Sequence, residues 1–314
     1  MKYIYKKEDQ DHLENLSNKK FLITGCNGML GSSFLNQIKI YVKNPIIYCF
    51  NRLELDVSRA SSFNKYIDLK PDFIIHCAAL VNADLCEKDN NKGRFNIVNG
   101  TKNIMNFAEI NKSKVFYPQS FLIYNDTNNV VDENTNPKPL CEYGRMKFEA
   151  ENIVLNQSNN SISVRMGGFF GGEEKDNNFV GKITSHISKL IKQGKQNMEI
   201  GDRVWQPTFT DDLAYNSLIL LANNKSGKYN MASHGWCSFF ELTNQILEIL
   251  NINDKFKVNC ISAKILGERE IAKRPLSVIM NNNRLKKENL DRQRNWKSSL
   301  KEYLEKQYFK NLFI

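Results

Sequence analysis

A glycine-rich turn directly after a short apolar segment constrains the fold of this chain more than any other feature. Residues 20–24 (KFLIT) are typical of a buried strand, and Gly25, Gly28 and Gly31 follow; an apolar, helix-like stretch then runs to about Val42. Glycines at such a junction let the backbone approach a pyrophosphate, toward which the next helix points its first N–H groups. The pattern is G-x-x-G-x-x-G rather than the usual G-x-G-x-x-G, and a plain glycine loop is the alternative interpretation.

Apolar runs recur through the first half of the chain and are separated by stretches of helical length. They begin near residues 45, 73, 114 and 161. Apolar strands alternating with helices indicate a parallel sheet that is covered on both faces. The predicted fold class is therefore α/β: a Rossmann-type doubly wound parallel sheet, with a smaller C-terminal α/β part that binds the substrate.

The strand–helix rhythm becomes less regular after Met166, which indicates a second structural part. We predict four segments: a polar and loosely ordered N-terminal extension (1–19), a dinucleotide-binding domain (20–165), a later segment that returns to it (about 205–232), and a substrate-binding part (166–204 and 233–314).

Charge and cysteine usage narrow the classes of partner. The formal net charge is +10, from 44 Lys and Arg against 34 Asp and Glu, but the basic residues form no block or tail. Small phosphorylated ligands therefore suit the chain better than nucleic acid does. The seven cysteines are odd in number and scattered, which indicates no disulfide framework and no metal site. Without a signal peptide or an apolar span, we expect a cytoplasmic protein that has no membrane partner.

The residues after the second predicted strand bear on the choice of cofactor. NAD-binding chains carry a carboxylate there for the ribose hydroxyls, whereas this chain has Asn51 and Arg52. A guanidinium at this point suits a 2′-phosphate, so NADPH is predicted, with NADH as the second option. Arg52 could instead be a solvated turn residue. Asp56, just downstream, could reach the adenine amino group or cap the following helix.

Tyr143 and Lys147 form the pair that carries chemistry. At positions i and i+4 they share one face of a predicted helix. A lysine beside a phenol can lower its pKa and make it a proton donor or acceptor near neutral pH. Ser120, at the end of the fourth predicted strand, could give a hydrogen bond to the same reacting oxygen, or it could be an ordinary turn serine.

Together these features resemble the extended short-chain dehydrogenase/reductase superfamily. The resemblance rests on TGCNGMLG, LDV at 55–57, HCAA at 76–79, NIVNGTKN at 96–103, Ser120, YGRMK and RMGGFFGG. Within the superfamily the chain is most similar to dTDP-4-dehydrorhamnose reductase-like sugar-nucleotide reductases. That closer likeness is carried by FNRLELDVS, NNFVGKI, QPTFTDDLA and AKRPLSVIMNNNRLK.

The resemblance and the turn residues together give a set of candidate site residues and no metal ligand. The catalytic residues would be Ser120, Tyr143 and Lys147. The cofactor would be bound by Gly25, Asn27, Gly28, Met29, Leu30, Gly31, Arg52, Asp56, Val57, Cys77, Ala78, Ala79, Asn99, Tyr143, Lys147 and Met166. The substrate would be bound by Val81, Ser120, Tyr143, Asn178, Arg203 and Arg274, the two arginines holding its diphosphate or, alternatively, being surface residues. His76 is expected to be structural.

Departures from related families narrow the reaction. The reductases usually have Thr-Asp-Tyr where this chain has Ser120-Phe121-Leu122. Sugar-nucleotide dehydratases have Asp-Glu after the hydroxyl residue, and some epimerase/reductases have a cysteine two positions after it. An apolar pair supplies neither acid–base group, so what remains is simple hydride transfer at a carbonyl, or a 4-epimerase that runs the same step twice.

We therefore expect NADPH-dependent reduction of a 4-keto (deoxy) sugar nucleotide for surface-polysaccharide sugars. An NAD-dependent 4-epimerase and a non-catalytic NADP-binding regulatory subunit are the alternatives. The expected partner is the nucleotide-sugar substrate, and the sequence leaves room for a homodimer.

Overall fold

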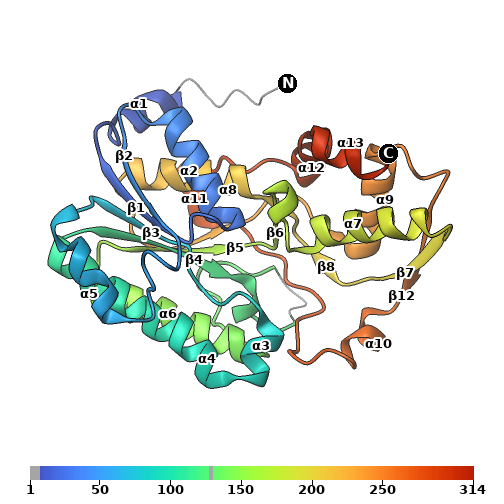
Figure 1. Cartoon of the computed structure of the whole chain (residues 1–314), viewed down its shortest axis with the longest axis horizontal. Helices are drawn as coiled ribbons and strands as arrows, with labels where there is room; N and C mark the ends of the chain where they lie inside the picture. Colours follow the sequence, from blue (N-terminus) through green and yellow to red (C-terminus); the bar gives the residue numbers. More distant parts are fainter. Residues whose placement is uncertain (1–7, 127–129) are drawn as a thin grey trace.

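The computed structural model describes residues 8–126 and 130–314 (Figure 1). Residues 1–7 of the predicted N-terminal extension lie outside that range. A six-stranded parallel sheet forms the centre of the larger part, with the strand order β10-β5-β4-β3-β1-β2. The strands are β1 (Lys20–Thr24), β2 (Ile46–Phe50), β3 (Phe73–His76), β4 (Lys114–Ser120), β5 (Ile162–Met166) and β10 (Gly227–Met231). The predicted α/β fold with a doubly wound parallel sheet is confirmed.

Helices cover both faces of this sheet, which explains why its central strands lack polar alternation. One face is packed by α2 (Met29–Tyr41) and α8 (Thr210–Ala222), and α1 (Glu8–Glu14) lies on α8. The other face is covered by η1 (Ala60–Leu69), α3 (Ala83–Lys88), α4 (Asn90–Arg94), η2 (Phe95–Asn99), α5 (Gly100–Asn111) and α6 (Glu142–Gln157). Consecutive residues of β4 serve the two cores in turn, Phe116 packing on Phe34 of α2 and Tyr117 facing the opposite side.

The smaller part has its own apolar core and lies beside the carboxyl ends of the strands (Figure 1). Its helices are α7 (Phe179–Lys192), α9 (Phe239–Ile249), α10 (Ala263–Gly267), α12 (Trp296–Leu304) and α13 (Gln307–Leu312). Its strands pair as β7 (Asn197–Gly201) with β12 (Lys257–Ile261) and β8 (Val204–Trp205) with β11 (Cys237–Ser238). The remaining elements are η3 (Phe121–Ile123), β6 (Phe169–Phe170), η4 (Glu173–Lys175), β9 (Thr208–Phe209) and α11 (Asn283–Lys287). We propose the domain boundaries that were predicted from the sequence: a dinucleotide-binding domain (20–165), a later segment that returns to it (about 205–232) and a substrate-binding part (166–204 and 233–314).

The N-terminal segment differs from the loosely ordered extension that we predicted. Residues 8–14 form α1, and Asp9 on this helix is completely buried. Its carboxylate pairs with Arg292 at 2.8 Å and accepts a hydrogen bond from the Tyr215 hydroxyl at 3.0 Å. The prediction was made from polar composition, which does not show that Asp9 has partners in distant parts of the chain. Among the described residues, no helix is both long and apolar enough to cross a bilayer.

Candidate active site

The glycine-rich turn forms a cradle of close backbone contacts between β1 and α2. Gly25 has φ +66°, and a side chain there would lie 2.9 Å from the Ala78 nitrogen. A side chain on Gly31 would overlap the carbonyl oxygen of Gly25. Gly28 caps α2 with no side-chain hydrogen bond, and the first turn of α2 holds no acidic residue. A helix N-terminus with no carboxylate beside it favours an anion, so these residues fit the pyrophosphate of a dinucleotide.

Buried hydrogen bonds join the end of β1 to the end of β3. The Thr24 hydroxyl lies 3.0 Å from His76 Nδ1 and accepts a hydrogen bond from the Ala78 nitrogen at 3.2 Å. On the other side of the ring, the Thr101 hydroxyl lies 3.4 Å from His76 Nε2. Burial, helped by the charge of Lys147, lowers the pKa of His76 to about 3. A neutral, buried imidazole between two threonines supports the structural role expected for His76.

Arg52 and Asp56 lie on the turn that follows β2. The Arg52 side chain is 67% exposed, and its Nε lies 4.0 Å from the Asp56 carboxylate. Asp56 accepts hydrogen bonds from the nitrogen and the hydroxyl of Ser58. Burial raises the pKa of Asp56, but these hydrogen bonds and the charges of Arg52 and Arg59 outweigh it and hold the pKa below its usual value. Asp56 therefore serves as the cap of its own turn, and the exposed Arg52 is open to a ligand.

The structure brings Tyr143, Lys147 and Ser120 to one edge of the sheet. Tyr143 and Lys147 are both buried on the first turns of α6, and Ser120 is the last residue of β4. The Lys147 ammonium donates a hydrogen bond to the Pro118 carbonyl at 2.7 Å and lies 3.9 Å from the centre of the Tyr117 ring. Ser120 also acts as a turn serine, since its hydroxyl oxygen accepts a hydrogen bond from the Leu122 nitrogen.

The predicted lowering of the Tyr143 pKa by Lys147 is wrong for this arrangement. Burial raises the pKa of Tyr143, with Cys86 and Cys141 adding to the rise, and a hydrogen bond with Ser120 opposes it. Burial has the opposite effect on the lysine: it is the main cause that lowers the pKa of Lys147 to about 7. Desolvation disfavours the charged form of both groups, and spacing in the sequence cannot show this.

Replacing Lys147 by methionine is expected to raise the free energy of unfolding at neutral pH, because folding strips this amine of water. The folded-state pKa of about 7 is below the ordinary value of 10.5, so between them the unfolded chain binds more protons and wild-type stability rises with pH. The advantage of the variant should shrink over that range. Urea unfolding at neutral pH and at about pH 9 measures both effects. A variant less stable than wild type at neutral pH would contradict the burial argument.

Two buried contacts that sequence reasoning missed hold α6 in place. Gln119 donates a hydrogen bond to the Lys147 carbonyl at 2.8 Å and accepts one from the Ser120 nitrogen at 2.8 Å. One turn after Lys147, Glu151 pairs with Arg165 of β5 at 2.9 Å, and both side chains are almost fully buried. A charged residue inside a strand whose other residues are uncharged was the signal that could have revealed Arg165. The two contacts fix the position of α6 along its axis relative to the ends of β4 and β5.

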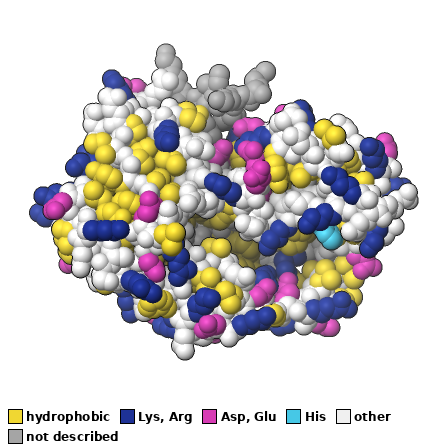
Figure 2. Space-filling view, in the orientation of Figure 1, with side chains coloured by type: hydrophobic (Ala, Val, Ile, Leu, Met, Phe, Trp, Pro, Cys, Tyr) yellow, Lys and Arg dark blue, Asp and Glu magenta, His cyan; other side chains and the backbone are white. Residues whose placement is uncertain are grey.

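The other predicted cofactor residues gather around the carboxyl ends of the strands. Asn27, Met29 and Leu30 belong to the glycine turn and the start of α2; Cys77, Ala78 and Ala79 follow β3; Val57 contacts Gly100; Asn99 ends η2; and Met166 ends β5. Figure 2 shows the surface hollowed between the two parts of the molecule, on the side where these strands end. The geometry is that of the ligand crevice in open α/β sheets.

The predicted substrate residues are more dispersed than the catalytic ones. Val81 is 71% exposed on the loop after β3, and Asn178 caps α7 and donates a hydrogen bond to the Phe169 carbonyl. Arg203 is held by Glu270 at 2.7 Å and Arg274 by Asp84 at 3.0 Å. The two arginines therefore meet carboxylates of this chain.

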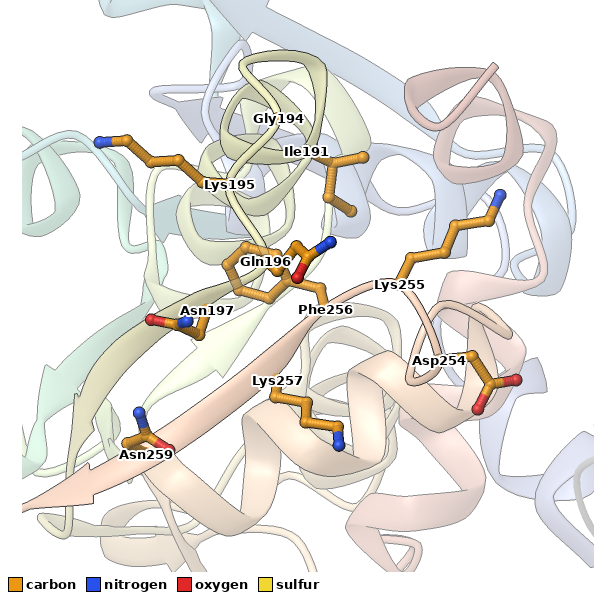
Figure 3. A pocket seen from close by; sticks show the side chains of 10 residues that line it. All are labelled: Ile191, Gly194, Lys195, Gln196, Asn197, Asp254, Lys255, Phe256, Lys257 and Asn259. Carbon is orange, nitrogen blue, oxygen red and sulfur yellow. The ribbon is translucent and has the colours of Figure 1, made fainter.

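A cavity of about 690 Å³ lies away from these residues, between the end of α7 and the loop before β12. It is lined in part by Lys195, Lys255 and Lys257. Figure 3 shows their ammonium groups pointing apart, so they do not converge on one anion. We therefore place the candidate site at the ends of the sheet strands.

Comparisons with known proteins show which family this chain matches. Residues 19–309 match the family described as the RmlD substrate binding domain. The chain is 24% identical over 298 residues to the spore coat polysaccharide biosynthesis protein SpsK of Bacillus subtilis, covering 91% of this chain and 97% of that protein.

Two solved structures are similar over 91% of this chain and 98% of their own. A dTDP-4-dehydrorhamnose reductase from Clostridium acetobutylicum has a TM-score of 0.83 and 28% identity. A dTDP-4-dehydrorhamnose reductase from Bacillus anthracis, solved in complex with NADP, has a TM-score of 0.81 and 26% identity. The fold and the sequence of this chain are thus similar to those of two dTDP-4-dehydrorhamnose reductases.

Proposed function

Because this chain belongs to the RmlD substrate binding domain family, we propose that it is an NADPH-dependent reductase of a 4-keto sugar nucleotide. The observation that carries the proposal is that Ser120 ends β4 and that Tyr143 and Lys147 lie on the first turns of α6, at the same edge of the parallel sheet as the glycine turn after β1. Similarity to two dTDP-4-dehydrorhamnose reductases supports the reaction, and the NADP complex of one supports the cofactor. Similarity to SpsK supports a place in polysaccharide sugar synthesis, which we propose to be cytoplasmic.

In this proposal the bound nicotinamide cofactor supplies the hydride for the carbonyl carbon. Tyr143 donates its proton to the developing alkoxide, and burial keeps the phenol protonated until that charge forms. Ser120 gives a hydrogen bond to the same oxygen. Lys147, whose pKa lies near 7, orients the nicotinamide ribose.

The pair after Ser120 favours a simple reductase. Phe121 packs against the core of the smaller part, and Leu122 packs against the core between the sheet and the helices α5 and α6. Neither side chain can move a proton, so Phe121 and Leu122 add no acid–base group to Tyr143 and Lys147. One such group is sufficient for carbonyl reduction, whereas dehydration of the sugar needs further proton transfers.

Replacing Arg52 by alanine is expected to weaken NADPH binding about tenfold and to leave NADH binding within about twofold. The reason is that only NADPH carries the 2′-phosphate that this exposed guanidinium can reach. Fluorescence titration of both cofactors measures the effect. Arg59→Ala is the matched control, because Arg59 also pairs with Asp56, at 3.6 Å. Equal loss of both cofactors in Arg52→Ala, or tighter NADH than NADPH binding in wild type, would refute the preference.

The reaction itself is tested by NADPH oxidation in the presence of 4-keto sugar nucleotides. Loss of nicotinamide absorbance that depends on the sugar nucleotide is the expected result. We also propose that the protein works without a metal ion, so a chelator should leave this rate unchanged.

A further inference from the structure

Arg203, one of the two arginines proposed to bind the substrate's diphosphate, is held by Glu270. Its two terminal nitrogens donate to the two carboxylate oxygens at 2.7 and 3.0 Å. The pair is largely buried, with side chains 13% and 21% exposed. The Nε of Arg203 is buried and has no hydrogen-bond partner among the described residues. A planar guanidinium held by two parallel bonds and with a spare donor is suited to exchange a carboxylate for a phosphate.

Arg274, the second arginine, is held by Asp84 across the two parts of the molecule. Its guanidinium donates to Asp84 at 3.0 Å, and Asp84 also accepts a hydrogen bond from the Ala272 nitrogen at 3.1 Å. Burial raises the pKa of Asp84, but the bonds from Ala272 and Arg274 outweigh it and keep the carboxyl ionised. Figure 1 shows that the segment after β12, which contains α10, passes close to α3. Asp84 lies on α3.

Glu270 lies between the two arginines. Its Oε2, which accepts one of the two hydrogen bonds from Arg203, also lies 4.0 Å from Arg274. Two arginines and two carboxylates leave this four-residue cluster (Asp84, Arg203, Glu270 and Arg274) without net charge. An incoming anion therefore gains little binding free energy unless it displaces a carboxylate. Both arginines can be reached from the position that Glu270 occupies.

We propose that Glu270 is a specificity-determining residue that occupies Arg203 and yields it to a ligand with two linked phosphoryl groups. A diphosphate presents one anionic group to each arginine and so replaces both contacts of Glu270. A single phosphate replaces one and leaves the carboxylate beside it as a like charge. Competition of this kind lowers overall affinity but raises the preference for diphosphate over monophosphate. The inference rests on the proposed function, since it takes both arginines for the diphosphate site.

Glu270→Gln tests this competition directly in calorimetric titrations with dTDP, UDP, dTMP and UMP at saturating NADPH. We expect the variant to bind the diphosphates about fivefold more tightly than wild type and the monophosphates about twentyfold more tightly, so that the preference narrows. Glu268→Gln is the matched control: it removes the same charge from an exposed residue two positions earlier. The control should change every Kd by less than about twofold. Asp84→Asn is the second variant, which frees Arg274 alone.

Binding that is unchanged or weaker in Glu270→Gln, or equal gains in Glu270→Gln and Glu268→Gln, would overturn the inference. So would the absence of nucleotide binding by all variants. The titrations need no turnover, so they are separable from the proposed function. Tighter binding without NADPH oxidation would retain the role of Glu270 and reject the reductase, and NADPH oxidation with unchanged binding would do the reverse.

Discussion

Replacing Tyr143 by phenylalanine is expected to lower kcat about 10²- to 10⁴-fold, the range for losing a positioned proton donor. Tyr143 is the proposed proton donor, and burial raises its pKa, so the phenol is protonated at neutral pH. The ring stays in place, so the Kd for NADPH should change less than about twofold. Steady-state kinetics with a 4-keto sugar nucleotide, combined with cofactor titration, measure the two quantities separately.

Tyr117→Phe is the matched control for this experiment. Tyr117 is also buried, on β4, and its ring lies 3.9 Å from the Lys147 ammonium. Removal of its hydroxyl keeps that ring contact, and kcat should stay within about threefold of wild type. If Tyr143→Phe turns over as fast as this control, Tyr143 is not the proton donor. Loss of NADPH binding together with activity would instead assign it a structural role.

Replacing Glu151 by glutamine is expected to cost about 3–5 kcal/mol of folding free energy, since it leaves the guanidinium of Arg165 buried without a counter-charge. Glu151 accepts hydrogen bonds from Arg165 at 2.9 and 3.0 Å and from the Ser163 hydroxyl at 2.8 Å. Urea unfolding measures the loss. Activity should fall as well, because this contact holds the helix that carries Tyr143 and Lys147.

Glu149→Gln provides the comparison on the same helix. Glu149 pairs with Arg94 at 2.8 Å, but the two side chains are 39% and 46% exposed, so its loss should cost less than about 1 kcal/mol. A double variant, Glu151→Leu with Arg165→Met, should regain much of the lost stability because it removes both buried charges. Equal costs for Glu149→Gln and Glu151→Gln would show that the buried pair does not anchor α6.

The parts of this fold that the sequence predicted are those set by local pattern. The parallel sheet follows from apolar strands buried on both faces. The cradle follows from its glycines, of which Gly25 and Gly31 could not carry a side chain without overlap. The closeness of Tyr143 and Lys147 was predictable because they are one helical turn apart on α6; their catalytic role stays a prediction.

The parts that it did not predict depend on partners distant in the chain. Asp9 is buried in α1 because it meets Arg292, 283 residues away, and a helix of seven residues gave no periodic signal of its own. The carboxylates on Arg203 and Arg274 lie 67 and 190 residues away from them. The pKa of Tyr143 and of Lys147 depends on burial, which only the folded chain defines.

Incubation of the purified protein with NADPH and a panel of 4-keto sugar nucleotides tests the central claim most directly. Nicotinamide absorbance and the sugar product are followed together. The account predicts a protein purified largely free of nicotinamide that oxidises one NADPH for each 4-keto sugar reduced, with at least one member of the panel. A protein that carries stoichiometric NAD and oxidises no NADPH across the whole panel, while interconverting two 4-hydroxy sugars, would contradict it.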